Sequence, residues 1–106
     1  MKTYNKLVRD MIPQIIEAED KECSIRVLDD EEYTVALKTK LQEELNEFLE
    51  AKETNEQIEE LADLLEVVYS FARSQGTTVE ELEHIRKTKH DERGGFEQKI
   101  MLLTVQ

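Results

Sequence analysis

Two pairs of carboxylates in the middle of the chain have a spacing that suits a metal site between helices. Glu44 and Glu47 lie three residues apart, and Glu60 and Asp63 repeat this step. On a helix, residues three apart are neighbours on one face. Converging carboxylates repel one another unless cations neutralise them, and ligands that are all oxygen suit Mg²⁺ or Mn²⁺ better than Zn²⁺. We therefore interpret these four residues as candidate ligands of a divalent metal.

The three-residue step alone is a weak signal in this acidic chain. The same step joins Glu47 to Glu50, Glu53 to Glu56, and Glu80 to Glu83, and such pairs are usually solvated. The candidates differ from them in their place on the helix. At about 100° per residue, Glu44 and Glu60 each fall inside an apolar stripe, where an unpaired charge is costly. Only Lys40, one turn before Glu44, is well placed to neutralise them, so a cation is still needed.

Long helices are expected to position these carboxylates. The chain has three Gly and one Pro, so few residues interrupt its apolar periodicity. The predicted helices span about residues 30–51, 55–75 and 78–93, with a short helix after an N-cap at Asp10. At most two short strands are expected, near residues 24–28 and 99–105. We therefore predict a mainly all-α fold, a helical bundle that forms one domain over residues 1–106.

Several residues have the types that end or begin helices. We expect Asp29 or Asp30 to cap the first long helix at its N-terminus. Gly76 is expected at the C-terminal end of the second long helix, where left-handed backbone is common. Thr77 or Thr78 should cap the third.

Composition excludes several classes of function. The 106-residue chain has a formal net charge of −11, which opposes binding to nucleic acid or to anionic lipid. No apolar run is long enough to span a membrane, and residues 1–10 carry charges without an apolar core, so we expect no signal peptide there. Cys23 is the one cysteine, so no intramolecular disulfide is possible, and we expect a half-buried thiol. We therefore expect a cytoplasmic protein that binds neither nucleic acid nor membranes.

The second long helix is apolar over a wider arc than one partner helix covers. Ile58, Ala62 and Tyr69 lie well round from Leu64 and Phe71. A helix that is apolar on two sides needs partners on both, and small domains bury little surface alone. We expect a homodimer to complete the bundle, with a tetramer as the alternative.

Basic residues gather near both ends of the chain, whereas the acids concentrate in its middle. If the ends fold over the bundle, they can bind substrate phosphates. The candidate phosphate ligands are Lys6, Arg9, Lys89 and Arg93 from the ends, together with Lys40 from the middle of the chain. The alternative is that each of them balances surface charge or caps a helix C-terminus.

The carboxylate pattern and both end segments resemble a known family. The pattern is Glu43-Glu44-x-x-Glu47 followed by Glu60-x-x-Asp63. It is similar to the signature of the all-α nucleoside triphosphate pyrophosphohydrolases, which include MazG-like enzymes, phosphoribosyl-ATP pyrophosphohydrolase and the dimeric dUTPases. Residues 4–13 and 93–96 resemble a narrower group, the short single-domain MazG-like proteins often labelled phosphoribosyl-ATP pyrophosphohydrolase-like. The resemblance covers nearly the whole chain.

The resemblance implies a chemistry and a set of roles. A nucleoside triphosphate substrate would be cleaved to monophosphate and pyrophosphate with Mg²⁺, or with Mn²⁺ in its place. Glu44, Glu47, Glu60 and Asp63 would be the metal ligands. Glu43, which lies off the apolar stripe, or Glu47 would orient the attacking water, so the candidate catalytic residues are Glu43, Glu44 and Glu47. The family usually forms dimers or tetramers.

Three functional hypotheses follow. Only residues 48–59 separate the two acidic motifs, which leaves little chain to shape a base pocket. We therefore favour the removal of non-standard or excess nucleotides. The nearest alternative is the phosphoribosyl-ATP pyrophosphohydrolase of histidine biosynthesis. A third hypothesis, from another class, is a non-catalytic acidic helical module that binds a partner.

Overall fold

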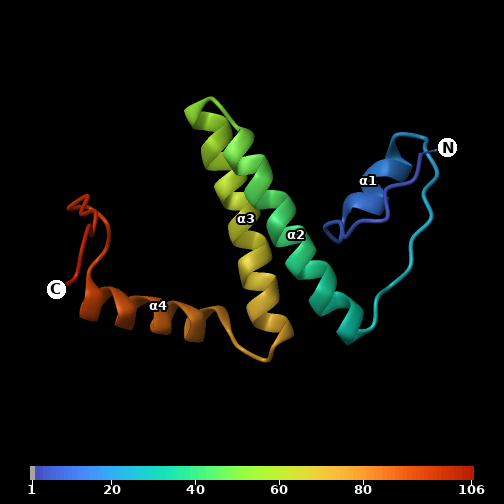
Figure 1. The fold of residues 1–106 in the computed structure, drawn as a ribbon. Helices are drawn as coiled ribbons and strands as arrows, with labels where there is room; N and C mark the ends of the chain where they lie inside the picture. Colours follow the sequence, from blue (N-terminus) through green and yellow to red (C-terminus); the bar gives the residue numbers. More distant parts are fainter. Residues whose placement is uncertain (1) are drawn as a thin grey trace.

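The computed structural model describes residues 2–106, which form four helices and the segments that connect them (Figure 1). The helices are α1 (Ile12–Ala18), α2 (Asp30–Glu50), α3 (Thr54–Ser74) and α4 (Val79–Arg93). The predicted all-α fold and the three long helices are confirmed. Among residues 2–106 there is no strand. Residues 24–28 and 99–105 lie on opposite sides of the helix pair (Figure 1), so neither segment has a partner to pair with.

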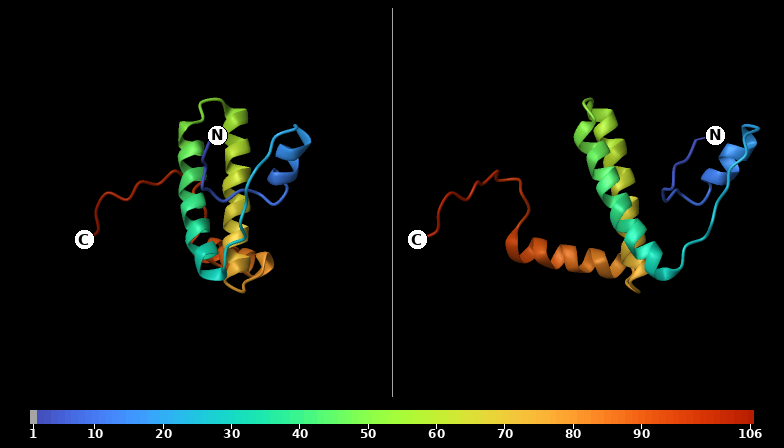
Figure 2. Two further views of the ribbon diagram at one scale, coloured as in Figure 1. Left: turned by 90° about the vertical axis from the view of Figure 1, so that its right-hand side faces the viewer. Right: turned by 45° about the vertical axis from the view of Figure 1, so that its right-hand side comes forward.

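Helices α2 and α3 lie side by side and antiparallel, joined by a short connection at residues 51–53 (Figures 1 and 2). Leu37 and Val67 are the buried apolar residues of the described chain, at 2% and 8% exposed. Glu44 is buried with them at 7% exposed. The helix pair thus has a thin core, and a carboxylate is part of it.

The N-terminus of α2 is fixed by reciprocal hydrogen bonds. The Asp29 carboxylate accepts a hydrogen bond from the backbone N–H of Glu32 at 2.8 Å, and the Glu32 carboxylate accepts one from the N–H of Asp29 at 3.4 Å. This capping box satisfies two donors that the helix leaves free. Hydrogen bonds from Arg26 also lower the pKa of Glu32. The cap is therefore Asp29, one of the two residues expected, and not Asp30.

The turn between α3 and α4 uses two of the expected residues. Gly76 follows the end of α3 with φ +83°, a left-handed conformation that glycine adopts without strain. The hydroxyl of Thr78, not that of Thr77, accepts a hydrogen bond from the backbone N–H of Glu81 at 3.0 Å. Helix α1 differs from expectation, since its N-cap is Met11 and not Asp10, with no side-chain hydrogen bond at the cap.

The single chain is expanded. Its radius of gyration is 18.0 Å, whereas a compact chain of about 100 residues has about 13 Å. Within the described part of the chain, α2 contacts α3 and α3 contacts α4, while α1 contacts no other helix. Helix α1 stands beside the α2–α3 pair, and α4 and the tail project away from it (Figure 2). Cys23 is exposed and not half-buried, and its Sγ lies 4.0 Å from the backbone oxygen of Pro13 in α1. None of the four helices has the length and apolar character that crossing a membrane requires.

Candidate active site

The α2 side of the site is a row of acids with one lysine. Lys40 Nζ lies 3.4 Å from Glu43 Oε1 and 3.3 Å from Glu44 Oε1, across one helical turn. The side chain of Glu44 is 9% exposed and that of Lys40 is 16% exposed. Glu47, one turn further along, is exposed. Lysine therefore neutralises part of this row, but only one oxygen of the buried Glu44.

Helix α3 brings its own pair of acids against Glu44. Because α3 runs antiparallel to α2, Glu60 and Asp63 lie opposite the middle of α2. Glu44, Glu60 and Asp63 each offer a carboxylate oxygen, and these atoms lie within 4.8 Å of one another. Glu43, Glu44 and Glu47 form a second such group, so Glu44 belongs to both. The structure thus brings together the carboxylates predicted from the sequence, with Glu44 at their centre.

Two oxygens of this cluster are buried without a partner. Oε2 of Glu44 and Oε2 of Glu60 have neither solvent access nor a hydrogen-bond partner among residues 2–106. A buried carboxylate oxygen left unpaired costs free energy. A divalent cation bound between the two helices would satisfy both oxygens, and an all-oxygen donor set matches the preference of Mg²⁺ and Mn²⁺. The residues present therefore fit such a metal.

The charge state of Glu44 reflects this environment. Burial raises the pKa of the Glu44 carboxyl above its ordinary value, and a hydrogen bond and repulsion from Glu47 raise it further. Lys40 opposes these effects by stabilising the charged form. The buried site therefore binds the Glu44 proton more tightly than solvent does, and a bound cation would oppose this shift by stabilising the carboxylate.

The N-terminal segment supplies two cations to the acidic cluster. Arg9 donates a hydrogen bond from Nη2 to Asp63 Oδ1 at 2.7 Å, and Lys6 Nζ lies 3.7 Å from Glu43 Oε1. Both basic residues were predicted from the sequence as phosphate ligands. The sequence did not predict that Arg9 pairs with a candidate metal ligand.

A cavity of about 220 Å³ lies where this segment meets the helix pair. Its lining combines acidic and basic side chains with apolar, aromatic and hydroxyl ones. The lining residues are Leu7, Val8, Arg9 and Asp10 from the segment, Tyr33, Leu37, Lys40 and Glu44 from α2, and Asp63, Glu66, Val67 and Ser70 from α3. Tyr33 and Ser70 were not predicted from the sequence, because no local pattern shows which surface an irregular segment will cover.

Two of the predicted phosphate ligands lie elsewhere. Lys89 and Arg93 are exposed on α4, which contacts α3 and not α2. Helix α4 points away from the α2–α3 pair (Figure 1). Within one chain they are therefore not brought to the carboxylate cluster, and their role stays a prediction.

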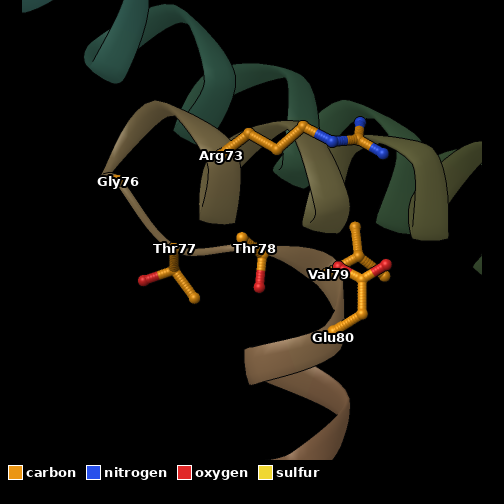
Figure 3. Close-up of a pocket in the computed structure, with 6 residues that line it drawn as sticks. All are labelled: Arg73, Gly76, Thr77, Thr78, Val79 and Glu80. Atoms are coloured by element: carbon orange, nitrogen blue, oxygen red, sulfur yellow. The ribbon is translucent and has the colours of Figure 1, made fainter.

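A larger hollow at the turn between α3 and α4 is not a second site. It has a volume of about 490 Å³ and is lined by Arg73, Gly76, Thr77, Thr78, Val79 and Glu80. Figure 3 shows that these side chains do not converge on one point. Arg73 is the one basic residue of this lining and Glu80 the one acidic residue. The hollow follows from the shape of the turn.

The chain matches the family model described as phosphoribosyl-ATP pyrophosphohydrolase over residues 6–90. No significant match was found among curated proteins or among solved structures. The matched range covers most of the chain and includes the acidic cluster of α2 and α3 and the basic residues Lys6 and Arg9. The family consists of metal-dependent pyrophosphohydrolases, which agrees with the acidic groups described above. The chain therefore belongs to the phosphoribosyl-ATP pyrophosphohydrolase family.

Proposed function

We propose that this chain hydrolyses nucleoside triphosphates to monophosphate and pyrophosphate with Mg²⁺, and that it removes non-standard or excess nucleotides. One observation carries the proposal. The buried carboxylate of Glu44 lies with oxygens of Glu60 and Asp63 within 4.8 Å, and oxygens of Glu44 and Glu60 lack partners. Mg²⁺ or Mn²⁺ fits such a donor set, and both metals bind phosphate oxygens.

The carboxylates divide into two roles. Glu44, Glu60 and Asp63 would hold the metal, with Glu47 completing the ligand set from the exposed side of α2. The bound metal would supply charge neutralisation on the phosphate chain. Glu43 would orient the attacking water, with Glu47 as the alternative. A water-orienting carboxylate must be held in place and remain accessible.

Glu43 meets both conditions. Its side chain is 30% exposed, and Lys6 and Lys40 lie 3.7 Å and 3.4 Å from its Oε1. Glu44, with a side chain only 9% exposed, is too enclosed for that role and better placed as a ligand.

The basic residues nearest the cluster would bind the substrate phosphates. Lys6, Arg9 and Lys40 lie within ion-pair distance of the acids, so they are close enough to reach phosphates held at the same place. Lys89 and Arg93 are retained as phosphate ligands only if α4 of another subunit reaches the site.

The nearest alternative substrate is phosphoribosyl-ATP, which would place the chain in histidine biosynthesis. The matched family model carries the name of this enzyme, but the match fits both substrate classes. Complementation of a histidine auxotroph that lacks this step separates the two hypotheses, because only a phosphoribosyl-ATP pyrophosphohydrolase restores growth. Growth would contradict a function restricted to removing nucleotides.

The third hypothesis is a non-catalytic acidic helical module. A folded-state metal site raises the melting temperature by mass action, whereas a module without a metal site shows no shift. Thermal melts with and without millimolar Mg²⁺ or Mn²⁺ distinguish the two, and no shift would favour the module.

The main test is pyrophosphate release from a panel of nucleoside triphosphates with Mg²⁺. We expect Glu60→Gln and Asp63→Asn each to lower kcat/KM by about 100-fold or more, since residues that merely support metal ligands already cost about 10- to 100-fold. Glu56→Gln is the matched control, because Glu56 is an exposed acid on the same helix. Equal activity of wild type, Glu60→Gln and Asp63→Asn would contradict the metal mechanism.

A further inference from the structure

Arg9 holds one of the proposed metal ligands. Its Nη2 lies 2.7 Å from Asp63 Oδ1, the distance of a charge-assisted hydrogen bond. Asp63 belongs, with Glu44 and Glu60, to the group of three carboxylates whose oxygens lie within 4.8 Å of one another. The guanidinium of Arg9 therefore neutralises a carboxylate that a divalent cation would need as a ligand.

The segment that carries Arg9 has few other ties to the helix pair. Residues 2–9 form no regular secondary structure, and α1, which follows, contacts no other helix in the described chain. Leu7 is the one residue between positions 2 and 10 that is not exposed. A second ion pair joins Lys6 to Glu43 at 3.7 Å. Two ion pairs and one half-buried leucine thus hold the segment over the cavity.

Both ion pairs join this segment to acids of the candidate site. Asp63 and Glu43 are acids of the two carboxylate groups that share Glu44. A divalent cation placed between Glu44, Glu60 and Asp63 would repel the nearby guanidinium and compete with it for Asp63. The same basic side chain would then be available for the phosphate oxygens of the substrate, which Arg binds in the same bidentate manner as a carboxylate.

We propose that Arg9 and the divalent cation are alternative partners of Asp63. In the metal-free protein Arg9 neutralises Asp63 and fixes residues 6–9 over the cavity. Metal binding releases Arg9, which then contacts substrate phosphate. This inference rests on the proposed metal site and adds a thermodynamic coupling to it: Arg9 weakens metal binding, and metal weakens the hold on the N-terminal segment by the same factor.

The opposite role for Arg9 is a positioning one. In that case Arg9 orients Asp63 for the metal, and its removal weakens metal binding. The two roles therefore predict changes of opposite sign in the same measurement.

Calorimetric titration of the full chain with Mn²⁺ in the absence of nucleotide tests the coupling. An exposed ion pair is worth up to about 1 kcal/mol, so we expect Arg9→Gln to bind Mn²⁺ about two- to fivefold more tightly than wild type. Arg9→Lys keeps the charge but not the planar guanidinium, so its affinity for Mn²⁺ should lie between those of wild type and Arg9→Gln. Arg86→Gln is the control, because Arg86 pairs with Glu83 on α4, which does not contact α2.

A second readout follows the segment itself. Backbone ¹⁵N heteronuclear NOE values of residues 6–9 should fall when Mg²⁺ is added to wild type, and should already be low in Arg9→Gln. Weaker or unchanged Mn²⁺ binding by Arg9→Gln would overturn the inference, as would NOE values that Mg²⁺ leaves unchanged. Wild type that binds no metal would overturn the proposed metal site as well, so the two failures are distinguishable.

Discussion

At the residue scale, the unusual group is a carboxylate in a core that has only two buried apolar residues among those described. Glu44 is 7% exposed beside Leu37 and Val67. A buried carboxylate lowers the stability of the folded protein unless a bound ligand stabilises its charge. Natural proteins tolerate such destabilising groups at functional sites. Lys40 contacts one Glu44 oxygen and leaves the other without a partner. Glu44 should therefore destabilise the metal-free protein and stabilise the metal-bound one.

Replacing Glu44 by Gln tests this balance. Because burial raises the pKa of Glu44, the folded protein binds this proton more tightly than the unfolded chain does. The contribution of Glu44 to stability is therefore fully present below its ordinary value of 4.5 and is lost as pH rises through the folded-state pKa. At neutral pH without metal, Glu44→Gln should raise the free energy of unfolding by about 1 kcal/mol.

Thermal melts from pH 4 to pH 8 measure this effect. A change of about 1 kcal/mol corresponds to roughly 4–8 °C in a chain of this size, and the difference should shrink as the pH falls. Added Mg²⁺ should raise the melting temperature of wild type but not that of Glu44→Gln. Glu50→Gln, an exposed acid of α2, is the control and should melt like wild type. A Glu44→Gln variant that is less stable at pH 8 would contradict the account.

At the element scale, regular helices were predictable and irregular segments were not. The expected ranges 30–51, 55–75 and 78–93 match α2, α3 and α4 closely, because each has an apolar period and terminal signals such as Asp29 and Gly76. The same period predicts Glu44 on the buried face, where the structure has it at 7% exposed. Residues 24–28 alternate like a strand but have no second strand to pair with. No local pattern of residues 4–10 indicates that Arg9 reaches Asp63. Those features depend on tertiary contacts, which periodicity does not encode.

Gly76 gives a test of the turn that ends α3. Its φ of +83° is unfavourable for residues with a side chain, while an added Cβ would meet no atom within 4 Å. Gly76→Ala should therefore lose stability through backbone strain alone, by about 1 kcal/mol. Gly76→Asn should lose less, because Asn tolerates left-handed backbone better than Ala does. Chemical denaturation measures both, and equal losses for Ala and Asn would show that the strain argument is wrong.

At the scale of the whole molecule, the single chain leaves too much apolar surface uncovered. Ile58, Leu61 and Leu65 lie on one stripe of α3 and are 60%, 41% and 45% exposed. Leu45 and Leu49 of α2 are 37% and 67% exposed. Exposed apolar surface of this extent usually marks an interaction surface. Together with the radius of gyration of 18.0 Å, it supports the expectation that a second copy of the chain completes the bundle.

A charge placed on this stripe should separate the subunits. We expect wild type to have about twice the chain mass of 12.4 kDa by light scattering, or four times that mass if it is a tetramer. Leu65→Glu should shift the mass toward that of one chain and lower the melting temperature, because burying an unpaired carboxylate in the interface is costly. Asn46→Glu adds the same charge at an exposed polar position of α2 and should keep the wild-type mass. A wild-type mass of 12.4 kDa at micromolar concentration would mean that one chain is stable with this surface exposed, and that Lys89 and Arg93 reach no neighbouring site.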